Sequence, residues 1–274
     1  PAPGPTPTVV LAGRPAGPGG IVVIGELDPE GQLRPVTFEL LAAADQLASH
    51  HGVGVSAFLL GPVWGQEPEW RKGGDASAAI STQLGHYGAD YWIRPRHDSE
   101  TALGAIGVLE SAIEQLEPRI ALGPATALGR DQLPHLAARL GLGLTGDAIG
   151  VEIDAEGQLL ALKPAFGGQL VAPIASHTLP AFATLRAGVL DRAEPDSERE
   201  PAKILEFSDE ETLMEPHWRD FQRETEIGCV DLDQASVVVC AGFGLGGAEQ
   251  IEKVAALADK LGGVVCGTRR VCDL

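Results

Sequence analysis

Along the first 150 residues, short apolar runs alternate with longer stretches in which apolar positions recur every three to four residues. The runs predict buried strands over 20–27, 53–61, 90–95 and 119–123, and the longer stretches predict helices over 36–52, 75–89, 99–118 and 128–141. Strands that alternate with helices at this spacing form parallel βαβ units, with helices covering both faces of the sheet. We therefore expect an α/β domain with a mostly parallel sheet, in which ligands lie beyond the carboxyl ends of the strands.

The pattern changes after residue 150. Apolar and polar positions alternate over 150–168 around a turn at 155–157, which predicts a hairpin, and further strands are predicted over 169–176, 179–188 and 203–208. Residues 191–228 hold 13 acids and 5 bases, which gives a net charge of −8 out of −18 for the whole chain. We interpret this segment as a solvated edge and linker in preference to a charged docking surface.

The βαβ pattern resumes near the end of the sequence. A strand is predicted over 235–242, a helix over 246–262 and a second strand over 263–270. Between the first strand and the helix, Gly242, Gly244 and Gly247 have the Gly-x-Gly-x-x-Gly spacing of dinucleotide-binding loops. One unit of about forty residues cannot bury a core alone, so this segment either completes the first sheet or begins a second domain.

A conventional NAD site needs an acidic residue at the end of the second strand, where it binds the ribose hydroxyls. Here that strand runs into Thr268, Arg269 and Arg270, and the first acid is Asp273. A hydroxyl followed by a guanidinium suits a phosphate or an electron-rich ring better than a ribose diol. The loop can still cradle a pyrophosphate through backbone N–H groups, or its glycines can simply allow helix and strand to pack closely.

Composition narrows the classes of function. The acidic balance argues against a nucleic-acid partner, because no basic stripe is present to neutralise phosphates. No apolar run reaches the length of a membrane span, and no signal-peptide pattern is seen, so we expect no membrane insertion and a cytoplasmic protein, or one of the mitochondrial matrix in a eukaryote. No metal-ligand spacing and no catalytic triad can be argued, so neither metal ligands nor catalytic residues are predicted. We interpret the four cysteines as buried reduced thiols; they are Cys229, Cys240, Cys266 and Cys272.

Five stretches together carry a family resemblance. They are GELDPEGQLRPVTFELLAAADQLA at 25–48, GPATALGRDQLPHLAARLGLGLTGDAIGVEI at 123–153, LKPAFGGQLVA at 162–172, LPAFATLRAGVL at 179–190 and VVVCAGFGLGGAEQIEKVAALADKLGGVVCGTRR at 237–270. In this order and spacing they resemble the α subunit of the electron-transfer flavoproteins, over nearly the whole chain from residue 20. Lys163, Phe166 and Ala187 stand where that family usually has Arg, Tyr and Pro.

Pattern and resemblance together divide the chain into four parts. They are a Pro/Gly-rich arm (1–20), an N-terminal α/β domain of the adenine-nucleotide-hydrolase type (21–190), an acidic segment and linker that completes it (191–230), and the incomplete beginning of a C-terminal α/β FAD-binding domain (231–274). The later flavin motifs of the family would follow residue 274. Most contacts to FAD are therefore expected beyond that position.

The resemblance implies an electron carrier and not an enzyme with its own substrate. Paired with a β subunit, such a chain carries electrons on FAD from a flavin dehydrogenase to a quinone oxidoreductase or the respiratory chain. The resemblance also raises AMP, held by the partner β subunit, as a further nucleotide. Two alternatives stay open: an adenine-nucleotide-binding α/β module without redox function, and a fragment of an NAD-binding dehydrogenase.

Carried over position by position, the candidate cofactor-binding residues are Gly242, Phe243, Gly244, Leu245, Gly247, Thr268 and Arg269. Thr268 and Arg269 stand where the family has a hydroxyl residue and an arginine that contact FAD. Such an arginine would favour negative charge on the reduced flavin. Phe243 departs from the pattern, because the family usually has an arginine there that reaches the cofactor. A phenylalanine can stack or pack, but it cannot bind phosphate.

Overall fold

The computed structural model of the chain describes residues 17–28, 30–61, 74–95, 102–207, 232 and 235–273. The chain forms two compact units, Pro1–Phe221 and Gln222–Leu274, and each is described by itself. Most of the predicted arm, the acidic residues 208–230 and Cys229 lie outside the described residues.

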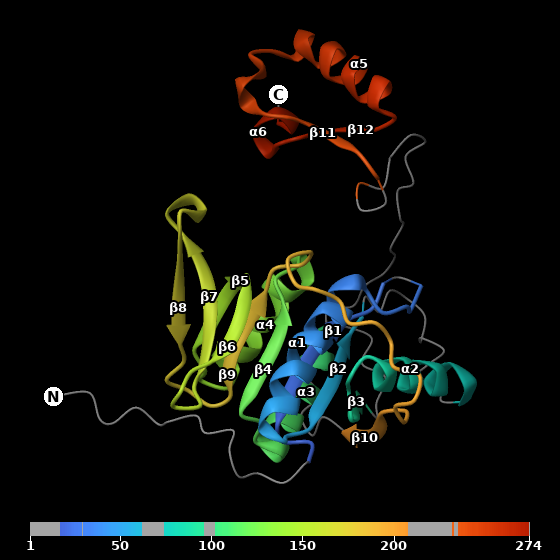
Figure 1. Ribbon diagram of the computed structural model, residues 1–274, viewed down its shortest axis with the longest axis vertical. Coiled ribbons are helices and arrows are strands. Elements are labelled where there is room, and N and C mark those ends of the chain that lie inside the picture. The colour runs from blue at the N-terminus through green and yellow to red at the C-terminus, as the bar shows by residue number, and fades with distance from the viewer. Residues whose placement is uncertain are drawn as a thin grey trace, which may run out of the picture. The chain divides into compact units, whose positions relative to one another are not determined.

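The main sheet of the first unit has seven strands. They are β1 (Ile21–Glu26), β2 (Val55–Leu60), β3 (Tyr91–Pro95), β4 (Ile120–Pro124), β5 (Leu144–Ala148), β9 (Ala181–Leu185) and β10 (Lys203–Phe207). Every pairing in this sheet is parallel, and the strand order is β10-β3-β2-β1-β4-β9-β5 (Figure 1). After β1 the chain continues toward one edge of the sheet, and after β4 it continues toward the other edge. The topological switch point therefore lies between β1 and β4.

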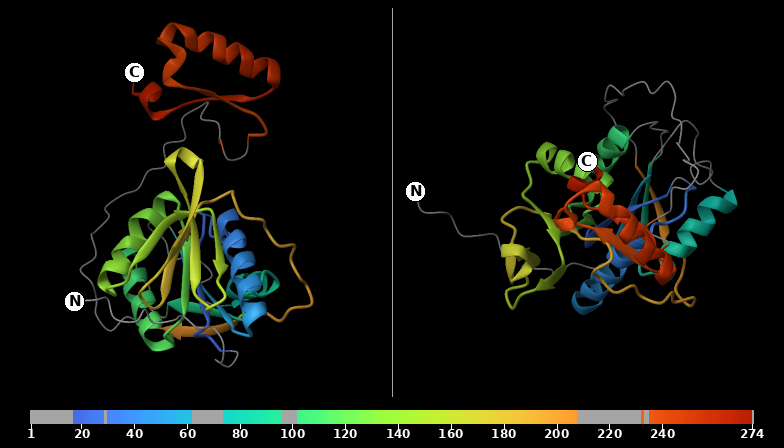
Figure 2. Two further views of the ribbon diagram at one scale, coloured as in Figure 1. Left: turned by 60° about the vertical axis from the view of Figure 1, so that its left-hand side comes forward. Right: turned by 90° about the horizontal axis from the view of Figure 1, so that it is seen from above.

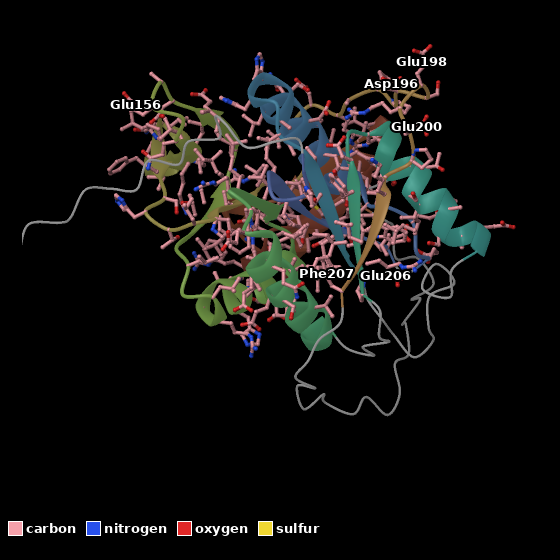
Figure 3. The ribbon with its side chains drawn as sticks, turned by 90° about the horizontal axis from the view of Figure 1, so that it is seen from below. Glu156, Asp196, Glu198, Glu200, Glu206 and Phe207 are labelled. Atoms are coloured by element: carbon pink, nitrogen blue, oxygen red, sulfur yellow. The ribbon has the colours of Figure 1, made fainter. Side chains whose placement is uncertain are left out.

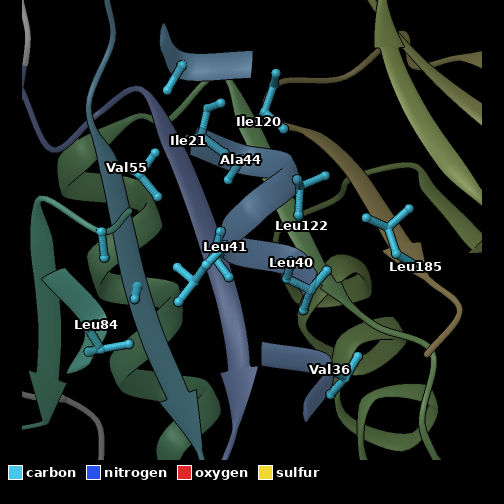
Figure 4. Packing of buried hydrophobic residues seen from close by; sticks show 14 of the residues in the cluster. Ile21, Val36, Leu40, Leu41, Ala44, Val55, Leu84, Ile120, Leu122 and Leu185 are labelled. Carbon is cyan, nitrogen blue, oxygen red and sulfur yellow. The ribbon is translucent and has the colours of Figure 1, made fainter. Parts of the chain in front are cut away.

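Helices cover both faces of this sheet (Figure 2), as the sequence pattern predicts. They are α1 (Pro35–His51) and α2 (Gly74–His86) on one face, and α3 (Ala102–Leu116) and α4 (Ala127–Arg139) on the other. The side chains of β1 alternate between the two cores: Ile21 packs on the side of α1, and Val22 on the side of α3. On α1, the fully buried Leu40 and Leu41 lie one helical turn or less from Ala44 and face the sheet (Figure 4).

A three-stranded antiparallel sheet is built beside the main one. It contains β6 (Gly150–Ile153), β7 (Leu159–Ala165) and β8 (Leu170–Ala175), in that order. The predicted hairpin over 150–168 is β6 and β7, and its turn is fixed by Asp154, whose carboxylate accepts the N–H groups of Glu156 (3.0 Å) and Gln158 (2.7 Å). The β7–β8 hairpin, closed by the short turn η2 (Phe166–Gly168), extends beyond the end of the main sheet (Figure 1).

The described part of the acidic segment is tied to the first unit by its backbone. The N–H of Asp196 donates to the carbonyl of His86 at the end of α2 (2.8 Å), and the chain then enters the main sheet as β10. The carboxylates point outward, as Figure 3 shows for Asp196, Glu198 and Glu200. Up to Phe207 the segment is therefore an exposed edge of the sheet. Some of its charges are paired with the first unit: Arg199 with Asp45 (2.8 Å), and Glu206 with Arg94.

The second unit is one parallel β-α-β arrangement. It contains β11 (Val238–Ala241), η3 (Phe243–Leu245), η4 (Ala248–Gln250), α5 (Ile251–Leu261), β12 (Val264–Gly267) and the single turn α6 (Arg269–Cys272). Its two strands pair only with each other among the described residues, so they do not complete the first sheet. The strand predicted over 263–270 is too long, because the chain turns into α6 after Gly267.

The prediction of buried thiols is wrong for the three cysteines that the structure describes. Cys240 and Cys272 are exposed, and Cys266 is partly exposed. Cys240 and Cys266 are register partners across β11 and β12. A two-stranded sheet with one covering helix has too few neighbours to bury both of its faces. Apolar sequence alone does not reveal this shortage of packing partners.

Candidate functional site

The glycine turn of the second unit follows β11 directly. The N–H of Leu245 donates to the carbonyl of Gly242 (2.9 Å), and the N–H of Gln250 donates to the carbonyl of Gly247 (3.1 Å), so two tight turns precede α5. The left-handed position is Gly246, with φ of 88°. Only glycine adopts this conformation without strain. The residue that the backbone requires to be glycine therefore lies outside the Gly-x-Gly-x-x-Gly spacing.

The other glycines differ in what surrounds them. A Cβ atom at Gly242 or Gly244 would meet no protein atom within 4 Å. At Gly247 a Cβ would lie 2.5 Å from the carboxylate oxygens of Glu249. Gly242 and Gly244 thus leave the backbone of the turn open to close approach by another molecule. The exposed carboxylate of Glu249 instead lies beside Gly247, in the turn before α5, where negative charge complements the positive end of a helix.

Thr268 and Arg269 come next to this turn because β12 ends beside β11. The N–H of Thr268 donates to the carbonyl of Ala241 (2.9 Å), the last residue of β11 before Gly242. Thr268 is the N-cap of α6, and Arg269 is the first residue of that turn. The Arg269 side chain is 95% exposed, and its Nε lies 3.9 Å from Asp273 Oδ2. The structure therefore brings the predicted residues together at the carboxyl edge of the two-stranded sheet.

Phe243 and Leu245 both belong to η3, but they are placed differently. Leu245 is half-buried, whereas the ring of Phe243 is 53% exposed. The guanidinium carbon of Arg270 lies 3.9 Å from the centroid of the Phe243 ring. Sequence reasoning missed Arg270 as a site residue, since the two partners are 27 positions apart in the chain. Its only signal was its place next to Arg269.

A buried carboxyl group lies at the carboxyl end of β1 in the first unit. Glu26 is fully buried and accepts hydrogen bonds from Arg34 Nη1 (3.1 Å) and from the Thr126 hydroxyl. Arg34 immediately precedes α1 and Thr126 caps α4, so the carboxylate lies at two helix N-termini, where the helix dipoles favour negative charge. Burial outweighs these contacts and raises the pKa of Glu26 above its ordinary value. The sequence did not single out this residue.

A second cluster ties together β5, β9 and α4. Asp147 accepts hydrogen bonds from Arg186 Nη2 (2.7 Å) and Arg130 Nη2 (3.1 Å), and its own backbone is left-handed, with φ of 59°. The hydrogen bond from Arg186 lowers the pKa of Asp147 below its ordinary value. A hollow of about 280 Å³ lies beside this cluster; it is lined by Gly129, Arg130, Pro134, Leu144, Gly146, Asp147, Lys163 and Thr184.

The sequence left three alternatives open: an electron carrier, an adenine-nucleotide-binding module and a fragment of an NAD-binding dehydrogenase. Comparison with known families decides between them. Residues 21–210 match the "Electron transfer flavoprotein domain", and residues 231–274 match the "Electron transfer flavoprotein FAD-binding domain". The first match alone covers more than half of the chain. The chain belongs to the electron transfer flavoprotein family.

Individual members of the family agree over most of the chain. "Electron transfer flavoprotein subunit alpha" of Thermoanaerobacterium thermosaccharolyticum is 33% identical over 249 residues, which cover 89% of this chain and 71% of that protein. The protein of the same name from Bacillus subtilis is 30% identical, with 92% and 73% covered. "Acryloyl-CoA reductase electron transfer subunit beta" of Anaerotignum propionicum is 31% identical, with 89% and 72% covered.

The residues of the second unit fit the FAD that its family description names. The open backbone at Gly242 and Gly244 suits a diphosphate, and an exposed guanidinium at Arg269 suits an anion or a flavin ring. Glu249 is the exception, because its carboxylate at Gly247 would repel an anion at the start of α5. The backbone at Gly242 and Gly244 is therefore better suited to an anion than the backbone at Gly247 is.

The described residues contain no group of three or more His, Cys, Asp or Glu side chains placed to hold a metal ion. No helix in the described ranges is long and apolar enough to cross a bilayer.

Proposed function

We propose that this chain is the α subunit of an electron transfer flavoprotein, and that together with a β subunit it carries electrons on FAD. The observation that carries the proposal is the carboxyl edge of the β11–β12 sheet, where an open glycine turn, Thr268 and Arg269 come together. The same segment matches a FAD-binding domain, and residues 21–210 match the other domain of the same family.

In this proposal the chain's own residues bind and orient the cofactor, and FAD supplies the redox chemistry. The backbone at Gly242 and Gly244 would hold the diphosphate, and Thr268 would offer a hydroxyl at the same edge of the sheet. Arg269 places positive charge near the cofactor, which stabilises negative charge on its reduced state. None of these groups transfers a proton or forms a covalent bond, in keeping with a carrier.

The two alternatives each meet an obstacle in the structure. An NAD site lacks its acid, because the end of β12 continues into Thr268 and Arg269. A nucleotide site in the first unit would place its phosphates at the switch point between β1 and β4. There the buried carboxylate of Glu26 already occupies the helix N-termini that would attract an anion. An incoming phosphate would be repelled.

The electron donor and acceptor are finer parts of the proposal. We infer a flavin dehydrogenase as donor and a quinone oxidoreductase as acceptor, since a carrier without its own substrate needs a partner on each side. The prediction of AMP concerns the β subunit, which is a different chain, and it stays a prediction.

The β7–β8 hairpin is the surface that we assign to the β subunit. Phe166 is 80% exposed, Leu170 60% and Val171 50%, and β8 is the edge strand of its sheet. Edge strands of proteins that act alone usually carry charges or proline, which block pairing with another strand; β8 reads LVAPIA, with Pro173 but no charge, so its side chains form an apolar face. An apolar edge of this kind is typical of a surface that another chain covers.

Replacing Leu170 by aspartate should weaken the α–β complex by at least about tenfold, because a carboxylate would be desolvated in an apolar contact. Titration of the full-length protein with its β subunit by light scattering or calorimetry measures this. Glu156→Ala, on the exposed turn of the neighbouring β6–β7 hairpin, is the control and should bind normally. Unchanged affinity in a folded Leu170→Asp protein would remove the hairpin from the interface.

The carrier function is tested with the full-length protein co-expressed with its β subunit. Under anaerobic conditions, flavin dehydrogenases of the source organism and their reduced substrates are added, and the visible flavin absorbance is followed. We expect the absorbance to bleach with at least one dehydrogenase and to return on addition of a quinone analogue. A flavin-containing complex that no dehydrogenase reduces would contradict the carrier role.

A further inference from the structure

Phe243 and Arg270 form a stacked pair beside the glycine turn. The guanidinium carbon lies 3.9 Å from the ring centroid, well inside the range of about 6 Å in which a cation is attracted to an aromatic face. Phe243 follows β11 and Arg270 follows β12, so the pair joins the two segments that meet at the carboxyl edge of the sheet. Both side chains are exposed, so burial in a core does not explain the contact.

The positive charge of Arg270 has no carboxylate within salt-bridge distance among the described residues. Its neighbour Arg269 approaches Asp273 at 3.9 Å, whereas Arg270 stacks on the uncharged ring of Phe243. The five N–H donors of a guanidinium point outward in its own plane, so stacking on a ring does not block them. Arg270 is thus held in one place while its hydrogen-bonding capacity stays available.

The ring that holds Arg270 lies between the two open glycines. Phe243 separates Gly242 from Gly244, the positions at which an added Cβ would meet no protein atom. An anion that approaches this backbone therefore comes beside the stacked guanidinium. Arginine binds phosphate in a bidentate manner, which phenylalanine cannot do.

We propose that Arg270 is a cofactor-binding residue that contacts the diphosphate of FAD at the Gly242–Gly244 turn, and that Phe243 holds its guanidinium in position. The proposal rests on the proposed FAD function and assigns to it a residue that neither the motif spacing nor the family description singles out. It also gives Phe243 a role, since an aromatic ring in the turn is the support for an arginine supplied by α6.

The test measures the dissociation constant of FAD, by flavin fluorescence, for the full-length protein in complex with its β subunit. Arg270→Ala should weaken binding about tenfold, the low end for a charge-assisted contact at an exposed site. Phe243→Ala keeps the positive charge of Arg270 but removes the ring on which its guanidinium stacks. It should weaken FAD binding about threefold. Lys260→Ala is the control. It removes one positive charge at the far end of α5 and should bind FAD as the wild type does.

The decisive variant exchanges the pair. Phe243→Arg combined with Arg270→Phe puts the guanidinium on the turn and the ring on α6, and we expect affinity within about threefold of the wild type. Normal FAD binding by Arg270→Ala would overturn the assignment of Arg270, and so would equal losses in Arg270→Ala and Lys260→Ala. In either case a flavin-loaded wild-type complex leaves the proposed function standing. A wild-type complex without FAD would instead refute the proposed function itself.

Discussion

Replacing Arg269 by alanine is expected to weaken FAD binding by about ten- to a hundredfold, the effect of losing one charge-assisted contact. It should also lower the reduction potential of the bound flavin, because the positive charge that favours the reduced, more negative cofactor is gone. The side chain is 95% exposed and makes only a 3.9 Å contact with Asp273. The fold should therefore be unaffected. Equilibrium FAD binding and spectroelectrochemical titration of the α–β complex measure the two effects.

Arg269→Lys separates charge from geometry. Lysine keeps the positive charge but lacks the planar fork of donors, so we expect the potential to recover more fully than the affinity. Lys260→Ala is again the control, because it removes one positive charge from the same unit. If Arg269→Ala binds FAD normally and at an unchanged potential, Arg269 does not face the cofactor.

The largest expected loss of stability follows from replacing Glu26 by alanine. Thr126 and Arg34 would lose their shared acceptor, and a cavity would remain at the end of β1. The cavity and the Thr126 hydroxyl left without an acceptor together cost about 3 kcal/mol, and urea unfolding of the first unit within the full chain measures this cost. Glu26→Gln keeps an acceptor for Thr126 and should cost less. Glu156→Gln, on an exposed turn, should leave stability unchanged within about 0.5 kcal/mol.

Because the pKa of Glu26 is raised, the effect on stability of replacing Glu26 should depend on pH. A carboxyl group whose pKa is higher in the folded than in the unfolded state binds more protons when folded, so its contribution to stability falls as pH rises. The loss begins near the ordinary value of 4.5 and is complete above the raised pKa. Glu26→Gln removes this pH-dependent contribution to stability. We therefore expect its stability relative to the wild type to improve as pH rises from about 4 to 7; the opposite trend would contradict a raised pKa.

The sequence predicted two kinds of strand: continuous apolar runs that are buried on both faces, and alternating runs such as the β6–β7 hairpin, whose two faces differ in exposure. Strand β1 is a continuous apolar run because its residues enter two cores in alternation. The sequence missed β5, whose residues Leu144–Ala148 include Thr, Gly and Asp, because its place is set by pairing with β9 and by ion pairs to Asp147. Tertiary contacts override local pattern at such an edge.

The candidate site was predictable to the extent that it is local in sequence. The motif spacing identified the turn, but it did not identify Gly246 as the left-handed residue, which depends on how the two tight turns join. It also could not reveal Arg270, because that contact exists only when β12 pairs with β11. Glu26 was passed over as the last residue of a strand, since its partners lie 8 and 100 positions away. The division of the chain at residues 190 and 230 stays a prediction.

The flavin content of the purified complex shows whether the second unit belongs to a FAD site. The full-length protein co-expressed with its β subunit is isolated without added flavin, denatured, and its released flavin is identified and counted per complex. We expect FAD in a near-stoichiometric amount, sharply reduced in Arg269→Ala. A folded complex that contains no flavin, and that does not take up added FAD, would contradict this expectation.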